Sequence, residues 1–113
     1  MKQVAAITPA ELSEMAERMY GSFVKGVVDV KQKLLVVDAE MHVDEEQYLL
    51  ERGSAQKDLW GINLHPANFS NDDFVEFDSM INIRPSQRNR SRDVEDPDMR
   101  NTIRGIVREI VTP

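Results

Sequence analysis

The sequence predicts an α+β domain, in which an antiparallel, curved sheet of four strands carries an N-terminal helix and a C-terminal helix closes the core. Helical periodicity dominates near the two ends of the chain, whereas alternating or β-branched segments fill most of the middle. No Pro/Gly-rich linker divides the chain. Its 113 residues therefore form one domain, 1–113, which is long enough for a single hydrophobic core.

The first helix is predicted to begin at Thr8-Pro9-Ala10-Glu11. Threonine is a common N-cap, proline suits the first turn, and glutamate at this spacing completes a capping box. The helix is expected to continue to a stop at Gly26, which places Gly21 inside it and in close contact with a neighbouring element. Its apolar stripe, at spacings of three and four, consists of Leu12, Met15, Ala16, Met19, Tyr20 and Phe23.

A β-hairpin is predicted next, because apolar segments 27–30 and 34–37 flank the polar Lys31-Gln32-Lys33. Strict alternation of apolar and polar residues extends the second strand to about residue 44. One face would carry Leu35, Val37, Ala39, Met41 and Val43, and the other Asp38, Glu40, His42 and Asp44. Segment 44–52 fits either a short helix, which we favour, or more of the same strand.

Segments 59–64 and 74–84 are predicted to complete the sheet. In the first, Gly61 marks a bulge or a close backbone approach, and Trp60, Ile62 and Leu64 face the core. The inward residues of the second would be Val75, Phe77, Ile81 and Ile83, and the outward ones Glu76, Asp78, Asn82 and Arg84.

Asp96-Pro97-Asp98 predicts the start of the last helix, with an N-cap, a proline in the first turn and an acid at the positive end of the dipole. One side of this helix is apolar, and beside it runs a ridge of Arg100, Arg104 and Arg108. The order of elements suits an antiparallel sheet that helices cover on one face, as in cystatin-like folds.

Charge is distributed unevenly along the chain. The formal net charge is −6, yet residues 80–113 hold seven arginines against five acids, while residues 1–79 hold seven basic and fifteen acidic side chains. Loop 84–92 contains four arginines and no acid, namely Arg84, Arg88, Arg90 and Arg92. Because guanidinium groups suit phosphates and carboxylates, this loop predicts an anion site. The alternative is a solvated loop that neutralises the protein's own acids.

We expect a non-enzymatic protein that binds a small anion or an acidic protein partner through loop 84–92. One alternative is a small enzyme, in which His42 with Glu40 or Asp44 performs acid–base chemistry. Asn82 and Arg84 would then hold an anionic substrate from the same sheet face. Another alternative is a homo-oligomer, such as a homodimer, in which the acidic strand face of one subunit meets the arginine loop of the next.

The composition argues against several other classes of protein and ligand. The absence of cysteine excludes disulfides and thiolate chemistry and suits a reducing, cytoplasmic location. No apolar run reaches the roughly 20 residues that span a membrane. The acidic pI and the lack of aromatic residues among the arginines disfavour nucleic acid without excluding it. No cofactor is predicted, although Glu40 and His42 could share a divalent ion such as Mg²⁺, Mn²⁺ or Ca²⁺; a polar strand face is the simpler interpretation.

Four segments resemble a small uncharacterised family found in bacteria, notably cyanobacteria. These segments are 39–44, 53–56, 59–64 and 81–87, with Glu-x-His-x-Asp, Leu-Trp-Gly and Ile-Asn-Ile-Arg-Pro blocks in the same order. The resemblance implies no activity, since the family is a domain of unknown function. It implies a shared polar pattern at His42, Asp44, Asn82, Arg84 and 89–91, whereas Arg88 stands where the family has a smaller residue.

Overall fold

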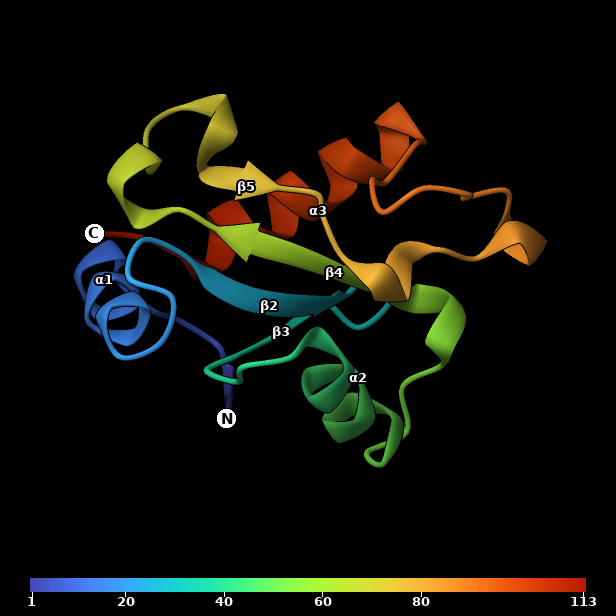
Figure 1. Ribbon diagram of the computed structural model, residues 1–113, viewed down its shortest axis with the longest axis horizontal. Coiled ribbons are helices and arrows are strands. Elements are labelled where there is room, and N and C mark those ends of the chain that lie inside the picture. The colour runs from blue at the N-terminus through green and yellow to red at the C-terminus, as the bar shows by residue number, and fades with distance from the viewer.

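The computed structural model describes residues 1–113 and contains a five-stranded antiparallel sheet with three α-helices (Figure 1). The strands are β1 (Lys2–Val4), β2 (Val24–Asp29), β3 (Leu34–Val37), β4 (Leu59–Leu64) and β5 (Val75–Glu76), in the order β1-β3-β2-β4-β5. The helices are α1 (Pro9–Glu17), α2 (His42–Leu50) and α3 (Pro97–Ile110). The predicted α+β class and antiparallel sheet are confirmed. The additional strand is β1, whose three residues are too few to show an alternating pattern.

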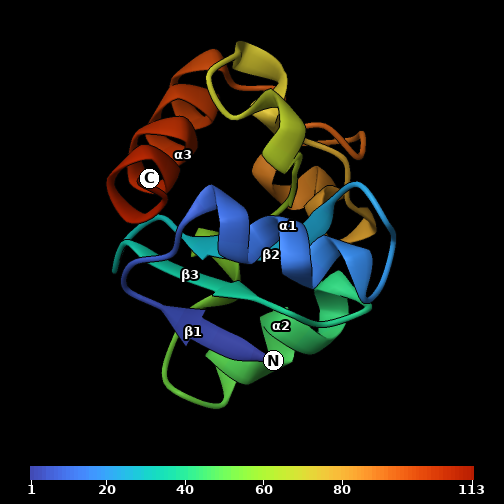
Figure 2. The ribbon, with the colours of Figure 1, turned by 90° about the vertical axis from the view of Figure 1, so that its left-hand side faces the viewer.

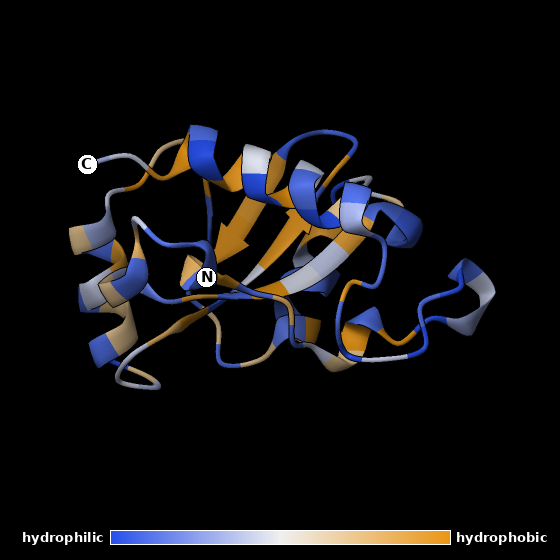
Figure 3. Cartoon of the chain, turned by 90° about the horizontal axis from the view of Figure 1, so that it is seen from above, coloured by the Kyte–Doolittle hydropathy of each residue, from blue (hydrophilic) through white to orange (hydrophobic).

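Both faces of the sheet are covered, and each has its own apolar core (Figure 2). The larger core, of 19 buried residues, joins α1 and α3 to one face of the central strands. On the other face α2 packs through Leu49 against Val27, Val36 and Leu59. The expectation that helices cover only one face is therefore wrong. Figure 3 shows the apolar residues of α3 on its sheet-facing side.

The capping box of α1 forms as predicted, since Glu11 N–H donates to Thr8 Oγ1 and Thr8 N–H donates to Glu11 Oε1, both at 3.1 Å. The helix ends at Glu17, well before Gly26, which lies inside β2. Gly21 has a φ of +89°, and a Cβ placed on it would meet no atom within 4 Å. Its conformational freedom thus allows a left-handed turn after the helix, and the close packing expected at this position is absent.

The long strand expected at 34–44 is wrong. β3 ends at Val37, because Asp38 adopts a left-handed φ of 71°, and α2 begins at His42. Glu40, His42 and Asp44 therefore do not share a strand face. The helix favoured for 44–52 is confirmed, although it begins two residues earlier. Its buried positions include Glu45 and Glu46, which break the apolar stripe by which a helix is recognised.

The long strand expected at 74–84 is also wrong, since β5 contains only Val75 and Glu76. Two short 3₁₀ turns follow it, at Met80–Asn82 and Pro85–Gln87. Val75 is buried and Glu76 exposed, as predicted, but the pattern is reversed at residues 82–84, where Asn82 and Arg84 are buried and Ile83 is 39% exposed.

Two further predictions are confirmed. Asp96 caps α3 by accepting a 2.9 Å hydrogen bond from Asp98 N–H. Gly61 is a point of close approach, because a Cβ placed there would lie 2.5 Å from Cβ and Oγ of Ser79. The segment that follows β5 thus crosses directly over the middle of β4.

Candidate functional site

Asn82 completes the exposed edge of β4. β5 pairs with β4 only at Asn63 and Leu64, which leaves the backbone of Gly61 without a strand partner on that side. The Asn82 side chain takes the place of the missing strand: Oδ1 accepts from Gly61 N–H at 2.8 Å, and Nδ2 donates to Gly61 C=O at 2.9 Å. The role of Asn82 is therefore to satisfy buried backbone groups.

Arg84 also satisfies backbone groups, at the start of β4 and just before it. Its Nη2 donates to Leu59 C=O at 2.6 Å and its Nη1 donates to Gln56 C=O. The guanidinium carbon lies 4.0 Å from the ring centroid of Trp60, and burial lowers the Arg84 pKa. Arg84 is only 8% exposed, and its side chain points into the protein rather than toward solvent.

The rest of loop 84–92 is organised by internal hydrogen bonds. The buried Asn89 donates from Nδ2 to Asn82 C=O at 2.8 Å and to Asp93 C=O at 2.6 Å. The Glu95 carboxylate accepts from Arg90 N–H and Ser91 N–H at 2.8 and 2.9 Å, and the Ser91 hydroxyl, with these amides, lowers the Glu95 pKa.

The four loop arginines are consequently separated. Arg84 is buried, and Arg92 Nε forms a 2.5 Å ion pair with Asp78 Oδ1. Arg88 and Arg90 are exposed and form no ion pair. The structure brings only one of the four, Arg92, into the same cavity as another predicted site residue, His42.

That cavity, which we call the His42 pocket, has a volume of about 250 Å³. Its polar residues are Lys25, His42, Asn63, Asp78, Ser79 and Arg92. Its apolar residues are Tyr20, Phe23, Met41, Val43, Met80 and Ile81. Met41, Val43 and Met80 are 51%, 50% and 65% exposed, which is unusual for side chains of this kind. The pocket therefore combines the buried polar residues His42, Asn63 and Ser79 with an apolar rim.

The His42 ring is held as a neutral base. Nε2 lies 2.8 Å from the carbonyl oxygen of Ile62. Because a carbonyl can only accept, Nε2 carries the proton and Nδ1 is the basic nitrogen of the neutral ring. Burial lowers the His42 pKa and outweighs the Ile62 carbonyl and the Asn63 side chain, which act in the opposite direction, while the nearby Lys25 ammonium lowers the pKa further.

Lys25 and Asn63 face each other across the β2–β4 pair. The Lys25 ammonium lies 4.9 Å from the ring centroid of Tyr20 and has no acidic partner. Asn63 Nδ2 donates to Glu76 Oε1 at 3.0 Å, while its buried Oδ1 receives no hydrogen bond. The pocket thus offers one unpaired cation and one unused acceptor.

Sequence reasoning identified His42 and Arg92 but missed Lys25 and Asn63. The available signal was a polar residue among apolar or glycine neighbours in each of two strands, Val-Lys-Gly-Val and Ile-Asn-Leu. Glu40 and Asp44 are exposed and do not line the pocket. No group of three or more His, Asp or Glu side chains lies close enough to hold a metal ion.

Comparison with known proteins places the chain in a family. A family model described as "Protein of unknown function (DUF5674)" matches residues 3–110, which include all three helices and the His42 pocket. No curated protein and no solved structure matches the chain. None of its helices has the length and apolar character needed to cross a membrane. The chain therefore belongs to the DUF5674 family of proteins of unknown function.

Proposed function

We propose that the protein binds a small organic anion in the His42 pocket, namely a carboxylate that also carries an apolar portion and a hydrogen-bond donor. The observation that supports this proposal is the Lys25 ammonium, which lines an apolar-rimmed cavity without an acidic partner in a chain of net charge −6. An unpaired cation in a partly desolvated pocket is a strong attractor for an anion.

The charges of the pocket favour a carboxylate over a phosphate. Arg92 and Asp78 compensate each other at 2.5 Å, and His42 is neutral, so Lys25 supplies the net positive charge. A single ammonium matches the single charge of a carboxylate, whereas a phosphate dianion would keep an unmatched charge.

The neutral groups define the rest of the ligand. Asn63 Oδ1 and His42 Nδ1 are acceptors, so the ligand should present a hydroxyl or an N–H near its carboxylate. The exposed Met41, Val43 and Met80 would cover an aliphatic portion, since flexible methionines adapt to varied shapes. A branched 2-hydroxycarboxylate combines these features. Arg88 and Arg90 do not line this pocket and have no part in the proposal.

Titration with branched carboxylates and 2-hydroxycarboxylates tests the proposal. We expect NMR shifts at Lys25, His42 and Asn63, and Lys25→Gln should weaken binding about tenfold because a charge-assisted contact of about 1.5–3 kcal/mol is lost. Lys33→Gln, which removes an exposed lysine of the β2–β3 turn, is the matched control and should bind as the wild type does. Equal binding of the corresponding uncharged diols, or equal affinity of the two variants, would contradict the proposal.

A second candidate function, acid–base catalysis on the same ligand, is favoured by the fixed tautomer of His42. A neutral Nδ1 could remove the proton from the carbon next to the carboxylate. If it does, the ligand in D₂O should exchange that hydrogen for deuterium, as seen by ¹H NMR. His42→Gln can still donate to Ile62 C=O and should abolish the exchange while binding persists. Absence of exchange in the wild type would show that the protein binds the ligand without catalysing this reaction.

A further inference from the structure

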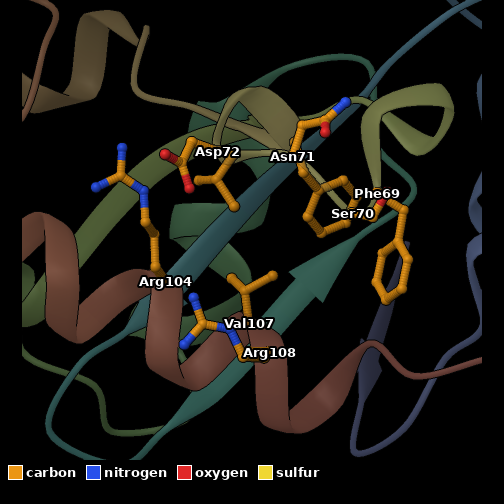
Figure 4. A pocket seen from close by; sticks show the side chains of 9 residues that line it. Phe69, Ser70, Asn71, Asp72, Arg104, Val107 and Arg108 are labelled. Carbon is orange, nitrogen blue, oxygen red and sulfur yellow. The ribbon is translucent and has the colours of Figure 1, made fainter.

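A second cavity, of about 130 Å³, lies between α3 and the segment that joins β4 to β5 (Figure 4). It shares no residue with the His42 pocket. α3 lines it with Arg104, Val107 and Arg108, and the β4–β5 segment lines it with Ser70, Asp72 and Phe74. We call it the Arg104 pocket.

α3 supplies two unmatched cations to this pocket. Arg104 and Arg108 stand one helical turn apart, a spacing at which like charges repel. Neither side chain takes part in an ion pair with this chain's acids. Arg104 Nε is buried and has no acceptor, while the guanidinium carbon lies 5.0 Å from the ring centroid of Phe77. A buried donor without an acceptor is costly unless something else fills that place.

Asp72 supplies a charge of the opposite sign from the other side of the pocket. Figure 4 shows its carboxylate directed toward the Arg104 guanidinium, yet the two form no ion pair. Ser70 and Asn71 contribute a neutral hydroxyl and an amide beside it. The pocket therefore separates an unmatched carboxylate from two unmatched guanidinium groups.

The apolar lining and the volume indicate what part of a ligand the pocket can enclose. Phe74, Val75 and Val107 are buried and line the pocket between its charged sides. A volume of about 130 Å³ corresponds to roughly four water molecules at about 30 Å³ each. A small molecule with a short aliphatic group fits within this space, which opens to solvent at the exposed Ser70, Asp72 and Arg108.

We propose that the Arg104 pocket is a second ligand site, specific for a small zwitterion of the α-amino acid class. The carboxylate of the ligand lies against Arg104 and Arg108, its ammonium lies against Asp72, and a short side chain faces Phe74 and Val107. An inorganic phosphate would be repelled by Asp72, and a divalent cation would be repelled by two guanidinium groups. The inference does not rest on the function proposed for the His42 pocket, because the two sites have no residue in common.

The experiment is an NMR titration of the full chain with alanine, N-acetylalanine and alanine amide. Alanine should shift the resonances of residues 69–75 and 104–108, and the two analogues, each lacking one charge, should bind at least tenfold more weakly. Free alanine that shifts none of these resonances at millimolar concentrations, or binding of N-acetylalanine as tight as that of alanine, would overturn the proposal.

Two variants add an independent readout. Arg104→Gln and Asp72→Asn should each weaken alanine binding about tenfold, the loss of one charge-assisted contact. Arg90→Gln, which removes an exposed arginine outside the pocket, should leave alanine binding unchanged. Asp72 lies in an exposed turn, so its substitution should leave the fold intact. If Arg104→Gln and Asp72→Asn both bound alanine as tightly as the wild type, the charged side chains of the pocket would not contribute to binding and the proposal would be overturned.

Discussion

Asn82→Ala is expected to lower the free energy of unfolding by about 3–4 kcal/mol, because each buried group left without a partner costs about 1–3 kcal/mol. The substitution removes both hydrogen bonds to Gly61 and the 3.0 Å bond from Nδ2 to Arg92 C=O. Water cannot readily replace them, since Asn82 has 0% exposure and Ser79 packs against Gly61. Urea denaturation followed by tryptophan fluorescence measures the change through Trp60.

The control is Asn101→Ala, in which the same side chain is removed from an exposed position of α3. It should change stability by no more than about 0.5 kcal/mol. Asn82→Asp keeps an acceptor for Gly61 N–H but replaces the donor to Gly61 C=O with an oxygen, so it should be at least as destabilising as alanine. A loss below about 1 kcal/mol for both Asn82 variants would show that the β4 edge does not depend on this side chain.

The same arrangement explains why sequence reasoning misread residues 74–84. Alternation assigns polar residues to solvent and apolar residues to the core. Here Asn82 and Arg84 point inward because their side chains replace the backbone of a strand, and this role leaves no distinct mark in one sequence. The resemblance to an uncharacterised family did identify both residues as part of a shared polar pattern. Only the structure shows that they belong to it because they satisfy backbone groups of β4.

Local signals were sufficient elsewhere. The capping box at Thr8, the N-cap at Asp96 and the β2–β3 hairpin depend on residues close together in sequence, and all three form. The His42 pocket depends on distant pairing, since Lys25 meets Asn63 only through the register of β2 and β4. Strand order is not encoded in any local pattern, so the sequence could not show that Lys25 and Asn63 lie in the same pocket.

Glu45 should make the protein less stable as pH rises. The side chain is fully buried in α2, and burial raises its pKa from 4.5 to about 10, although the Ala39 N–H acts in the opposite direction. The folded protein therefore keeps this proton at neutral pH, while the unfolded chain releases it above about pH 4.5. Between these values unfolding releases one proton, which lowers stability by about 1.4 kcal/mol per pH unit.

Urea denaturation of the wild type and Glu45→Gln between about pH 7 and 9 tests this expectation. The variant should be the more stable protein, with an advantage that grows by about 1.4 kcal/mol per pH unit. Glu14→Gln, at an exposed position of α1, should keep the wild-type slope. A constant difference between Glu45→Gln and the wild type would mean that Glu45 is ionised in the folded protein.

His42, one turn before Glu45, adds the opposite slope on the acidic side. Because burial lowers its pKa below 6.5, the unfolded chain binds a proton there first, and stability is lost as pH falls below about 6.5. Below about pH 6.5 the His42 contribution opposes that of Glu45, and above pH 6.5 the loss due to Glu45 continues. Compared with the wild type, Glu45→Gln should therefore lose stability less steeply as pH rises, whereas His42→Gln should lack the gain in stability that His42 gives as pH rises to about 6.5.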